Sequence, residues 1–377
     1  MRSAIVHYWL LQRRGGEKVL DAICRLLPDA DIFTLFLDPA ALSDEVRRHR
    51  VTASFLNPLR GGYRSLLPLM PMALETFDLR GYDLVVSSES GPAKGIITGA
   101  RSTHICYCHT PMRYFWDLDP AYRNEWSRSP WKRAAMAPLA NYLRLWDYAS
   151  AARVDRFVAN SENVQQRIWK TYRRECQVVY PPVEVASFYH KPAQDYFLVV
   201  SELVPYKRID SVVRAFSRSG RSLRIAGDGP EFRRLREGAA ANVEFLGRVS
   251  DAEVRELYAG CRALLLPGEE DFGIVTVEAM ASGKPVIALG RGGVLETAPP
   301  FGRVLYDEPS GESIQHALAT FETIEGRIRP ARLQEWAQAF SEAEFARKMA
   351  PILQVPHPSF EYKLTAVKSR GVLSSGL

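Results

Sequence analysis

Short apolar runs alternate with amphipathic stretches along nearly the whole chain, and this alternation constrains the fold more than any other feature. The apolar runs are 4–11, 31–36, 83–90, 104–110 and 156–162, then 196–202, 222–229, 242–247, 263–267, 285–290 and 303–306. The stretches between them, such as 17–27, 208–219 and 251–261, have helical spacing. Near-continuous apolar strands separated by helices are typical of parallel sheets covered on both faces. The pattern predicts an α/β protein.

A break between two sets of strands divides the chain. At 377 residues it is too long for one ordinary core. Residues 181–194 contain three prolines and interrupt the periodicity just before a new strand. We therefore predict two Rossmann-like, doubly wound domains, at residues 1–185 and 186–355, followed by a loose tail at 356–377.

The net charge of +6 falls in the first half of the chain, and residues 101–175 are both basic and rich in tryptophan. Such a region suits an anionic partner: nucleic acid, a membrane surface or a phosphorylated substrate. A merely solvated basic face is an equal alternative. Because no nucleic-acid recognition motif accompanies the basic region, we expect no nucleic-acid partner.

The composition also indicates a cellular compartment. No apolar run approaches the roughly 18 residues that span a bilayer. The five cysteines include no C-x-x-C pair, which argues against a disulfide framework or a zinc site. The sequence therefore predicts a cytoplasmic protein.

The strongest chemical signal is the string EEDFGIVTVEAMASGKPVIALG at residues 269–290. Glu270 follows an apolar run, which places it at the carboxyl end of a parallel strand, where open α/β sheets bind ligands. Glu278 stands eight positions later, in a helix that begins near Gly273. Backbone N–H groups at that helix start suit an anion or a hydroxyl. On pattern alone, two glutamates that flank an apolar turn are commonplace, so the pair does not define a site.

Two other segments suit phosphate chemistry. Lys207 and Arg208 stand at the start of a helical stretch, where the helix dipole disfavours cations unless they serve another purpose. Gly15 and Gly16 follow the first strand and allow the backbone to approach a phosphate closely, although a simple tight turn is the alternative.

The histidines and paired aspartates do not combine into a metal site. His109 ends an apolar run and therefore faces the ligand crevice, whereas we interpret His7 and His104 as structural. Asp117 and Asp119 have the Asp-x-Asp spacing of a metal site, but they follow a basic aromatic loop that better suits an acceptor groove. No metal is expected.

Taken together, the motifs resemble those of one known family. E-x7-E followed by A-M-A-S-G-K-P-V-I-A is similar to the signature of the retaining GT-B glycosyltransferases of family 4, which include many bacterial mannosyltransferases. Further segments in the same order extend the resemblance over residues 4–350: HYWLLQRRGGEKVL, ICYCHTPMRYFWD, VANSENVQQRI, VVYPPVE, LVPYKRID, IAGDGPE and VEFLGRVSDAEV. The closest likeness is to O-antigen and exopolysaccharide mannosyltransferases. The resemblance implies a GT-B fold with the active site between two domains.

The resemblance implies roles for the residues of the donor site. Glu270 would hold a donor-sugar hydroxyl beside the amides of Phe272, Gly273 and Ile274, and Glu278 would accept from the ribose hydroxyls. A carboxylate suits both roles because it accepts two hydroxyl protons at once. Neither glutamate needs to be an acid–base catalyst.

The cations and the remaining contacts also come from the resemblance. Lys207 and Arg208 would lie under the donor diphosphate and stabilise it as the leaving group. The sequence departs from the family at Glu202, where an arginine often stands; we expect Glu202 to turn away and Arg208 or Arg14 to supply the missing cation. The other implied contacts are Gly15 and Gly16 at the diphosphate and acceptor loop, Gly227 and Gly229 at the nucleoside, Arg248 and Val249 at the base edge, and His109 at the donor sugar.

The implied reaction is transfer of mannose from GDP-mannose to a lipid-linked saccharide acceptor, with retention, in bacterial surface polysaccharide synthesis. The cationic pair would replace a metal, so no cofactor is expected. Alternatives are another donor on the same scaffold (UDP-glucose, UDP-GlcNAc or a rhamnosyl donor) and a GT-B nucleotide-sugar epimerase. A non-catalytic module of GT-B form is disfavoured by the intact set of glutamates and cations.

A lipid-linked acceptor lies at an anionic membrane leaflet, so we expect the protein to sit peripherally on the cytoplasmic membrane face. The sequence offers a basic aromatic surface at residues 128–146, interrupted by Pro130 and Pro138. It comprises Arg128, Trp131, Lys132, Arg133, Arg144 and Trp146.

Overall fold

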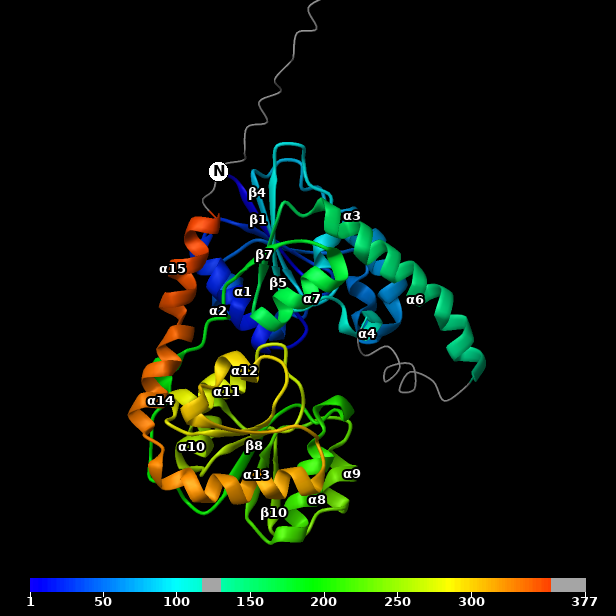
Figure 1. The fold of residues 1–377 in the computed structure, drawn as a ribbon. Coiled ribbons are helices and arrows are strands. Elements are labelled where there is room, and N and C mark those ends of the chain that lie inside the picture. Colours follow the sequence, from blue (N-terminus) through cyan, green and yellow to red (C-terminus); the bar gives the residue numbers. More distant parts are fainter. Residues whose placement is uncertain (117–129, 354–377) are drawn as a thin grey trace, which may run out of the picture.

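The computed structural model describes residues 1–116 and 130–353, which form two lobes, each built on one sheet (Figure 1). The first sheet has seven strands in the order β3-β2-β1-β4-β5-β6-β7, all paired in parallel. They are β1 (Ser3–His7), β2 (Asp31–Thr34), β3 (Val51–Ala53), β4 (Leu84–Glu89), β5 (Thr103–Cys108), β6 (Arg156–Ala159) and β7 (Cys176–Val178).

The second sheet repeats this arrangement with six parallel strands in the order β10-β9-β8-β11-β12-β13. They are β8 (Phe197–Val200), β9 (Leu223–Ala226), β10 (Val243–Gly247), β11 (Leu264–Leu266), β12 (Val286–Leu289) and β13 (Arg303–Tyr306). In each sheet the strand order reverses beside the first strand, which is the point where doubly wound folds bind ligands. The predicted α/β class with two Rossmann-like domains is confirmed.

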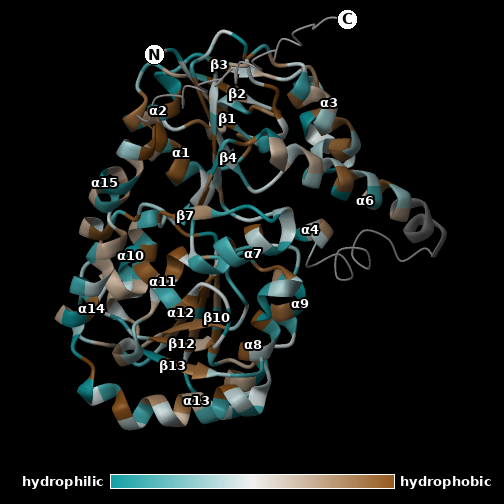
Figure 2. Cartoon of the chain, turned by 45° about the horizontal axis from the view of Figure 1, so that its top comes forward, coloured by the Kyte–Doolittle hydropathy of each residue, from teal (hydrophilic) through white to brown (hydrophobic). Residues whose placement is uncertain are grey.

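Helices cover both faces of the sheets because their apolar residues recur at helical spacing. Figure 2 shows apolar segments gathered at the second sheet and at α11 beside it. The helices are α1 (Gly15–Leu26), α2 (Asp44–Arg47), α3 (Met70–Glu75), α4 (Arg113–Trp116), α6 (Pro130–Ser150), α7 (Glu162–Tyr172), α8 (Ile209–Ser219), α9 (Phe232–Glu237), α10 (Asp251–Gly260), α11 (Ile274–Ala281), α12 (Val294–Thr297), α13 (Gly311–Ile324), α14 (Pro330–Ala337) and α15 (Glu342–Leu353).

The last helix, α15, returns to the first lobe, so the observed organisation differs from the expected second domain at 186–355. Phe345, Met349 and Leu353 are buried in the core of the first sheet, together with residues of α1. Arg25 of α1 also pairs with Glu342 at 2.7 Å. Figure 1 shows α15 beside α1. The chain therefore crosses between the lobes twice. The expected tail at 356–377 lies outside the described residues.

Helix α6 corrects the expectation that prolines interrupt this region, because it continues through Pro138. Trp146 is only partly exposed: its indole N–H donates to Glu75 at 3.1 Å, and its ring packs so closely on Gly95 that no Cβ fits there. Arg144 donates to the carbonyl of Phe115 at 3.1 Å. The other members of the expected basic aromatic surface (Arg128 and the side chains of Trp131, Lys132 and Arg133) lie outside the described residues.

Within residues 1–116 and 130–353, no helix combines the length and the apolar character that crossing a membrane requires.

Candidate active site

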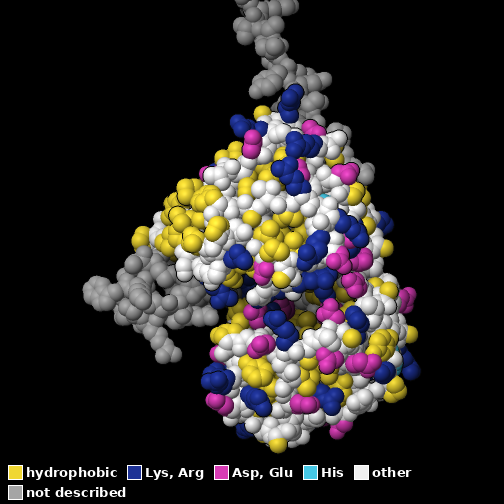
Figure 3. Space-filling model, turned by 180° about the vertical axis from the view of Figure 1, so that it is seen from behind, with side chains coloured by type: hydrophobic (Ala, Val, Ile, Leu, Met, Phe, Trp, Pro, Cys, Tyr) yellow, Lys and Arg dark blue, Asp and Glu magenta, His cyan; other side chains and the backbone are white. Residues whose placement is uncertain are grey.

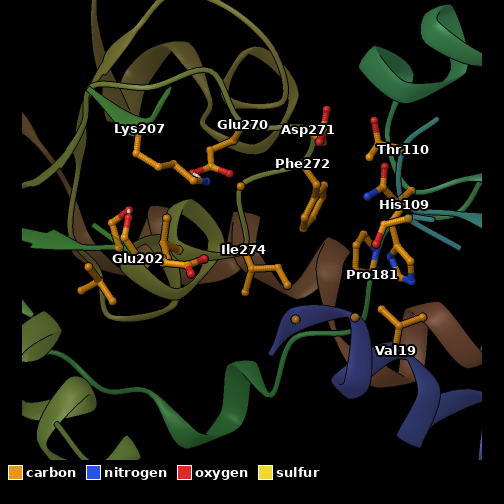
Figure 4. Close-up of a pocket in the computed structure, with 18 of the residues that line it drawn as sticks. Val19, His109, Thr110, Pro181, Glu202, Lys207, Glu270, Asp271, Phe272 and Ile274 are labelled. Atoms are coloured by element: carbon orange, nitrogen blue, oxygen red, sulfur yellow. Dashed lines mark hydrogen bonds and ion pairs between the residues drawn. The ribbon is translucent and has the colours of Figure 1, made fainter. Parts of the chain in front are cut away.

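A cavity of about 340 Å³ opens between the lobes, and both lobes line it. Figure 3 shows the hollow between them, with charged side chains gathered around it. In Figure 4, Lys207 and Glu270 lie on one side, and His109, Thr110 and Val19 lie on the other. Eight of the predicted site residues line this cavity: Gly15, Gly16, His109, Lys207, Glu270, Phe272, Gly273 and Ile274.

Lys207 and Glu270 form an ion pair in this cavity. Lys207 ends a short 3-10 turn after β8, and Glu270 lies in the loop after β11, so two adjacent strand ends bring them together. Their side chains are 16% and 19% exposed. Gly268 is required here because a Cβ would lie 2.8 Å from the Cα of Lys207. The cavity thus presents a cation and a carboxylate, both shielded from bulk water.

The first lobe brings its backbone close to the cavity at two glycines. A Cβ on Gly15 would lie 2.6 Å from the Cδ1 of Ile274, and one on Gly16 would lie 2.5 Å from the hydroxyl of Tyr8. Glu17 secures this loop: its carboxylate accepts the Arg14 N–H at 2.7 Å and contacts the Nε2 of His7 at 3.3 Å. Burial favours a higher pKa for Glu17, but its hydrogen bond and charge interaction with His7 lower the pKa overall.

His109 is uncharged at neutral pH. Burial, reinforced by the nearby His7, lowers the pKa of His109 to about 3. Its Nε2 lies 3.0 Å from the Oγ of Ser88. A neutral imidazole can hydrogen-bond a hydroxyl without repelling a developing positive charge. His7 and His104, interpreted as structural, are both fully buried and lie outside the cavity lining.

A second, larger cavity of about 950 Å³ adjoins the first and shares Val200, Ser201, Glu202 and Val275 with it. The predicted nucleoside and base residues line it: Gly227, Gly229, Arg248 and Val249. Gly227 has φ +142°, and a Cβ there would overlap the carbonyl of Ser201, so only glycine allows the turn.

Glu202 does not turn away as expected. It lines both cavities and pairs with Arg14 of the other lobe at 3.1 Å. Since a carboxylate beside a diphosphate would be repulsive, the pairing with Arg14 offsets the charge of Glu202.

Arg208 and Glu278 line neither cavity. Arg208 has a left-handed backbone (φ +55°), and its guanidinium lies 3.4 Å from Asp210 of the following helix. Glu278 is 7% exposed; it accepts a hydrogen bond from Tyr258 at 3.1 Å and lies 3.5 Å from the Nζ of Lys18 in the first lobe. The structure therefore does not bring these two residues together with Lys207 and Glu270.

Four residues for which the sequence predicted no role also line the cavity. Tyr8, Thr110, Asn160 and Asp271 line the first cavity. Burial raises the pKa of Asp271, although Arg113 lies 3.3 Å away. Each of these four residues lies inside a segment that carries the family resemblance, and this was the available signal. In the described ranges, no three His, Cys, Asp or Glu side chains form a group that could hold a metal ion, and Asp117 and Asp119 lie outside those ranges.

Each sheet forms one Rossmann-like domain, and the cavity lies in the cleft between the two domains. A family model described as Glycosyltransferase Family 4 matches residues 13–187, and one described as Glycosyl transferases group 1 matches residues 185–340. The chain belongs to the GT-B glycosyltransferases of family 4.

Two curated relatives are mannosyltransferases. The O-antigen chain mannosyltransferase RfbU of Salmonella typhimurium is 30% identical over 206 residues, covering 50% of this chain and 56% of the relative. The GDP-mannose-dependent monoacylated alpha-(1-6)-phosphatidylinositol monomannoside mannosyltransferase of Corynebacterium glutamicum is 31% identical over 162 residues, covering 39% of this chain and 42% of the relative. The chain thus spans about half the length of these relatives.

A solved structure shares the fold over nearly the whole chain. Anabaena HepE in complex with UDP-glucose has a TM-score of 0.69 and 18% identity, and the match covers 94% of this chain and 99% of that chain. At this identity the likeness shows the GT-B fold alone.

Proposed function

We propose that the protein transfers mannose from GDP-mannose to a lipid-linked saccharide acceptor, with retention, in bacterial surface polysaccharide synthesis. The ion pair of Lys207 and Glu270, facing Gly15, Gly16 and His109 across the cleft, carries the proposal. Both relatives are mannosyltransferases, which supports mannose as the transferred sugar. The Corynebacterium glutamicum relative is GDP-mannose-dependent, which supports GDP-mannose as the donor.

In the proposed reaction the donor exchanges the partners of this ion pair. The diphosphate takes the place of Glu270 as the partner of Lys207, and a sugar hydroxyl donates a hydrogen bond to the carboxylate of Glu270. The bond from the anomeric carbon to the diphosphate breaks on the face where the acceptor hydroxyl enters. The leaving β-phosphate takes the acceptor proton, and the products are GDP and the mannosylated acceptor. Lys207 stabilises the charge that grows on the leaving group.

The donor is tested by calorimetric titration with GDP-mannose, UDP-glucose and UDP-GlcNAc in buffer that contains EDTA. We expect GDP-mannose to bind most tightly and binding to be unchanged by the chelator, because the proposed site uses cations of the chain in place of a metal. Tighter binding of a UDP-sugar would show that this sugar, and not GDP-mannose, is the donor. Binding or transfer that requires added Mn²⁺ would contradict the metal-free mechanism.

The proposal includes an acceptor at an anionic membrane surface. Although Arg128 and the side chains of Lys132 and Arg133 lie outside what the structure describes, α6 exposes three apolar side chains on its described part: Tyr142 is 50% exposed, Leu145 62% and Tyr148 52%. Their spacing of three residues places them along one side of the helix. Aromatic and aliphatic groups on a helix face insert at the headgroup boundary of a bilayer.

Replacing Tyr142, Leu145 and Tyr148 together by serine should weaken binding to anionic vesicles by about a hundredfold, because inserting part of each Leu or Tyr side chain contributes on the order of 1 kcal/mol. Vesicle sedimentation measures this, and added salt should weaken binding of the unchanged protein. Tyr189→Ser, at an exposed position of the other lobe, is the control. Undiminished sedimentation of the triple variant would exclude this face of α6 as a membrane-binding surface.

A further inference from the structure

The loop that carries Glu270 rests on its own lobe through a glycine turn. The N–H of Gly293 donates to the carbonyl of Glu270 at 2.9 Å. A Cβ on Gly293 would overlap the carbonyl of Phe272, and one on Gly292 would overlap the carbonyl of Glu270. Residues 269–273 are therefore supported from one side by the turn that leads into α12.

The first lobe holds the same loop from the other side, through the start of α7. Ser161 is the N-cap of α7: its Oγ accepts the Val164 N–H at 3.0 Å and donates to the carbonyl of Asp271 at 2.7 Å. The side-chain amide of Asn163 donates to the same carbonyl at 3.3 Å. The segment VANSENVQQRI, which the family resemblance includes without a role, thus contacts the loop that carries Glu270.

Two arginines of the first lobe bind the acidic residues on either side of Glu270. Arg167 lies 2.6 Å from a carboxylate oxygen of Glu269 and 3.5 Å from one of Asp271. Arg113 lies 3.3 Å from the other oxygen of Asp271. The side chains of Arg167 and Arg113 are 16% and 14% exposed, and those of Glu269 and Asp271 are 34% and 21% exposed, so these pairs are partly shielded from water.

A carboxylate of the second lobe completes the contact. Glu296 of α12 accepts the N–H of Glu162 at 2.8 Å and that of Asn163 at 2.9 Å. The first N–H groups of a helix have no partner within the helix, and the helix dipole favours an anion there. Because Glu296 lies just after the glycine turn, the same short segment supports Glu270 and binds α7.

We propose that these contacts form an interdomain clamp that places Glu270 for transfer when the lobes are closed, with Glu296 and Ser161 as positioning residues. The clamp comprises Arg113, Ser161, Asn163 and Arg167 of the first lobe and Glu269, Asp271 and Glu296 of the second. Both sequence neighbours of Glu270 are held across the cleft, so closure fixes the carboxylate between them. The role in catalysis rests on the proposed function, whereas closure itself does not.

The first test is Glu296→Ala, measured by steady-state transfer and by calorimetry with GDP. A misplacement of about 1 Å at a reacting group lowers rates by on the order of 10²-fold, so we expect kcat to fall by about ten- to hundredfold. The Kd for GDP should stay within about twofold, since the clamp lies outside the nucleoside cavity. Glu296→Gln keeps one oxygen that accepts a hydrogen bond, so its kcat should fall less than that of Glu296→Ala. Glu312→Ala, exposed at the start of α13, is the control.

The second test needs no donor. Small-angle scattering of the ligand-free protein should give a larger radius of gyration for Glu296→Ala than for Glu312→Ala and the unchanged protein. If the unchanged protein transfers from none of the three nucleotide sugars, the proposed function fails while scattering still decides the clamp. If Glu296→Ala keeps both kcat and radius of gyration, the clamp is wrong. Should that variant not fold, Glu296→Gln is measured in its place against the same two criteria.

Discussion

Lys207→Ala should lower kcat by about 10²- to 10³-fold, because removing one preorganised group that stabilises a developing negative charge costs roughly 3–4 kcal/mol. Lys207 is the cation in the first cavity, and its ammonium faces Glu270 in a site shielded from solvent. The loss should appear in kcat more than in donor affinity, since the charge on the leaving group grows only as the bond breaks. Steady-state kinetics and calorimetry on the same preparation separate the two.

The matched control for this variant is Lys191→Ala. Lys191 lies in the same lobe, is 48% exposed and pairs with Glu256 at the surface, so its loss should leave kcat unchanged. If Lys207→Ala retains activity within about threefold of the unchanged protein, an effect of that size is too small for a leaving-group contact and Lys207 has no part in the mechanism.

The sequence predicted the buried strands well because their burial on both faces leaves a continuous apolar run. It missed β3 and β7, which are three residues long, only partly buried and at the sheet edge, so neither carries such a run. The position of α15 could not be predicted either. Its apolar face indicates a buried helix, but the sequence does not say which of two similar cores it covers.

The residues of the site likewise divide into those that the sequence could predict and those that it could not. Gly15, Lys207 and Glu270 each follow a strand, and strand ends meet at one edge of a parallel sheet, so their position together with the family resemblance placed them at the cavity. Contacts across the cleft, such as those of Arg14 with Glu202 and of Arg167 with Glu269, depend on how two separate sheets face each other. No local pattern encodes that orientation, which is why the clamp and the role of Glu202 appeared only in the structure.

A buried charge cluster supports the first lobe behind the cavity. Lys94 is fully buried and pairs with Glu89 at 3.1 Å and with Asp147, and both carboxylates are also fully buried. Asp147 in addition accepts hydrogen bonds from Trp116 of α4 at 2.7 Å and from Tyr172 of α7 at 2.9 Å. The cluster thus ties α4, α6 and α7 to the end of β4. Removing its one cation would leave two buried carboxylates facing each other.

Lys94→Met should therefore lower the free energy of unfolding by about 3–5 kcal/mol, the usual loss when one partner of a buried ion pair is removed.

The loss of stability in Lys94→Met should depend on pH. Burial raises the pKa of Glu89 to about 7 even though Lys94 opposes the rise, so the variant's carboxyl should titrate higher still. A carboxyl with a raised folded-state pKa stabilises the fold when protonated, and this stability disappears as pH rises through that pKa. Because Glu89 of the unchanged protein titrates near pH 7 itself, both proteins lose stability in parallel up to that pH. Denaturant unfolding should accordingly show a nearly constant loss from about pH 5 to about pH 7 and a larger one near about pH 8. Lys170→Met, exposed in the last turn of α7, should unfold like the unchanged protein. A pH-independent loss in Lys94→Met would mean that packing, and not charge, governs the cluster.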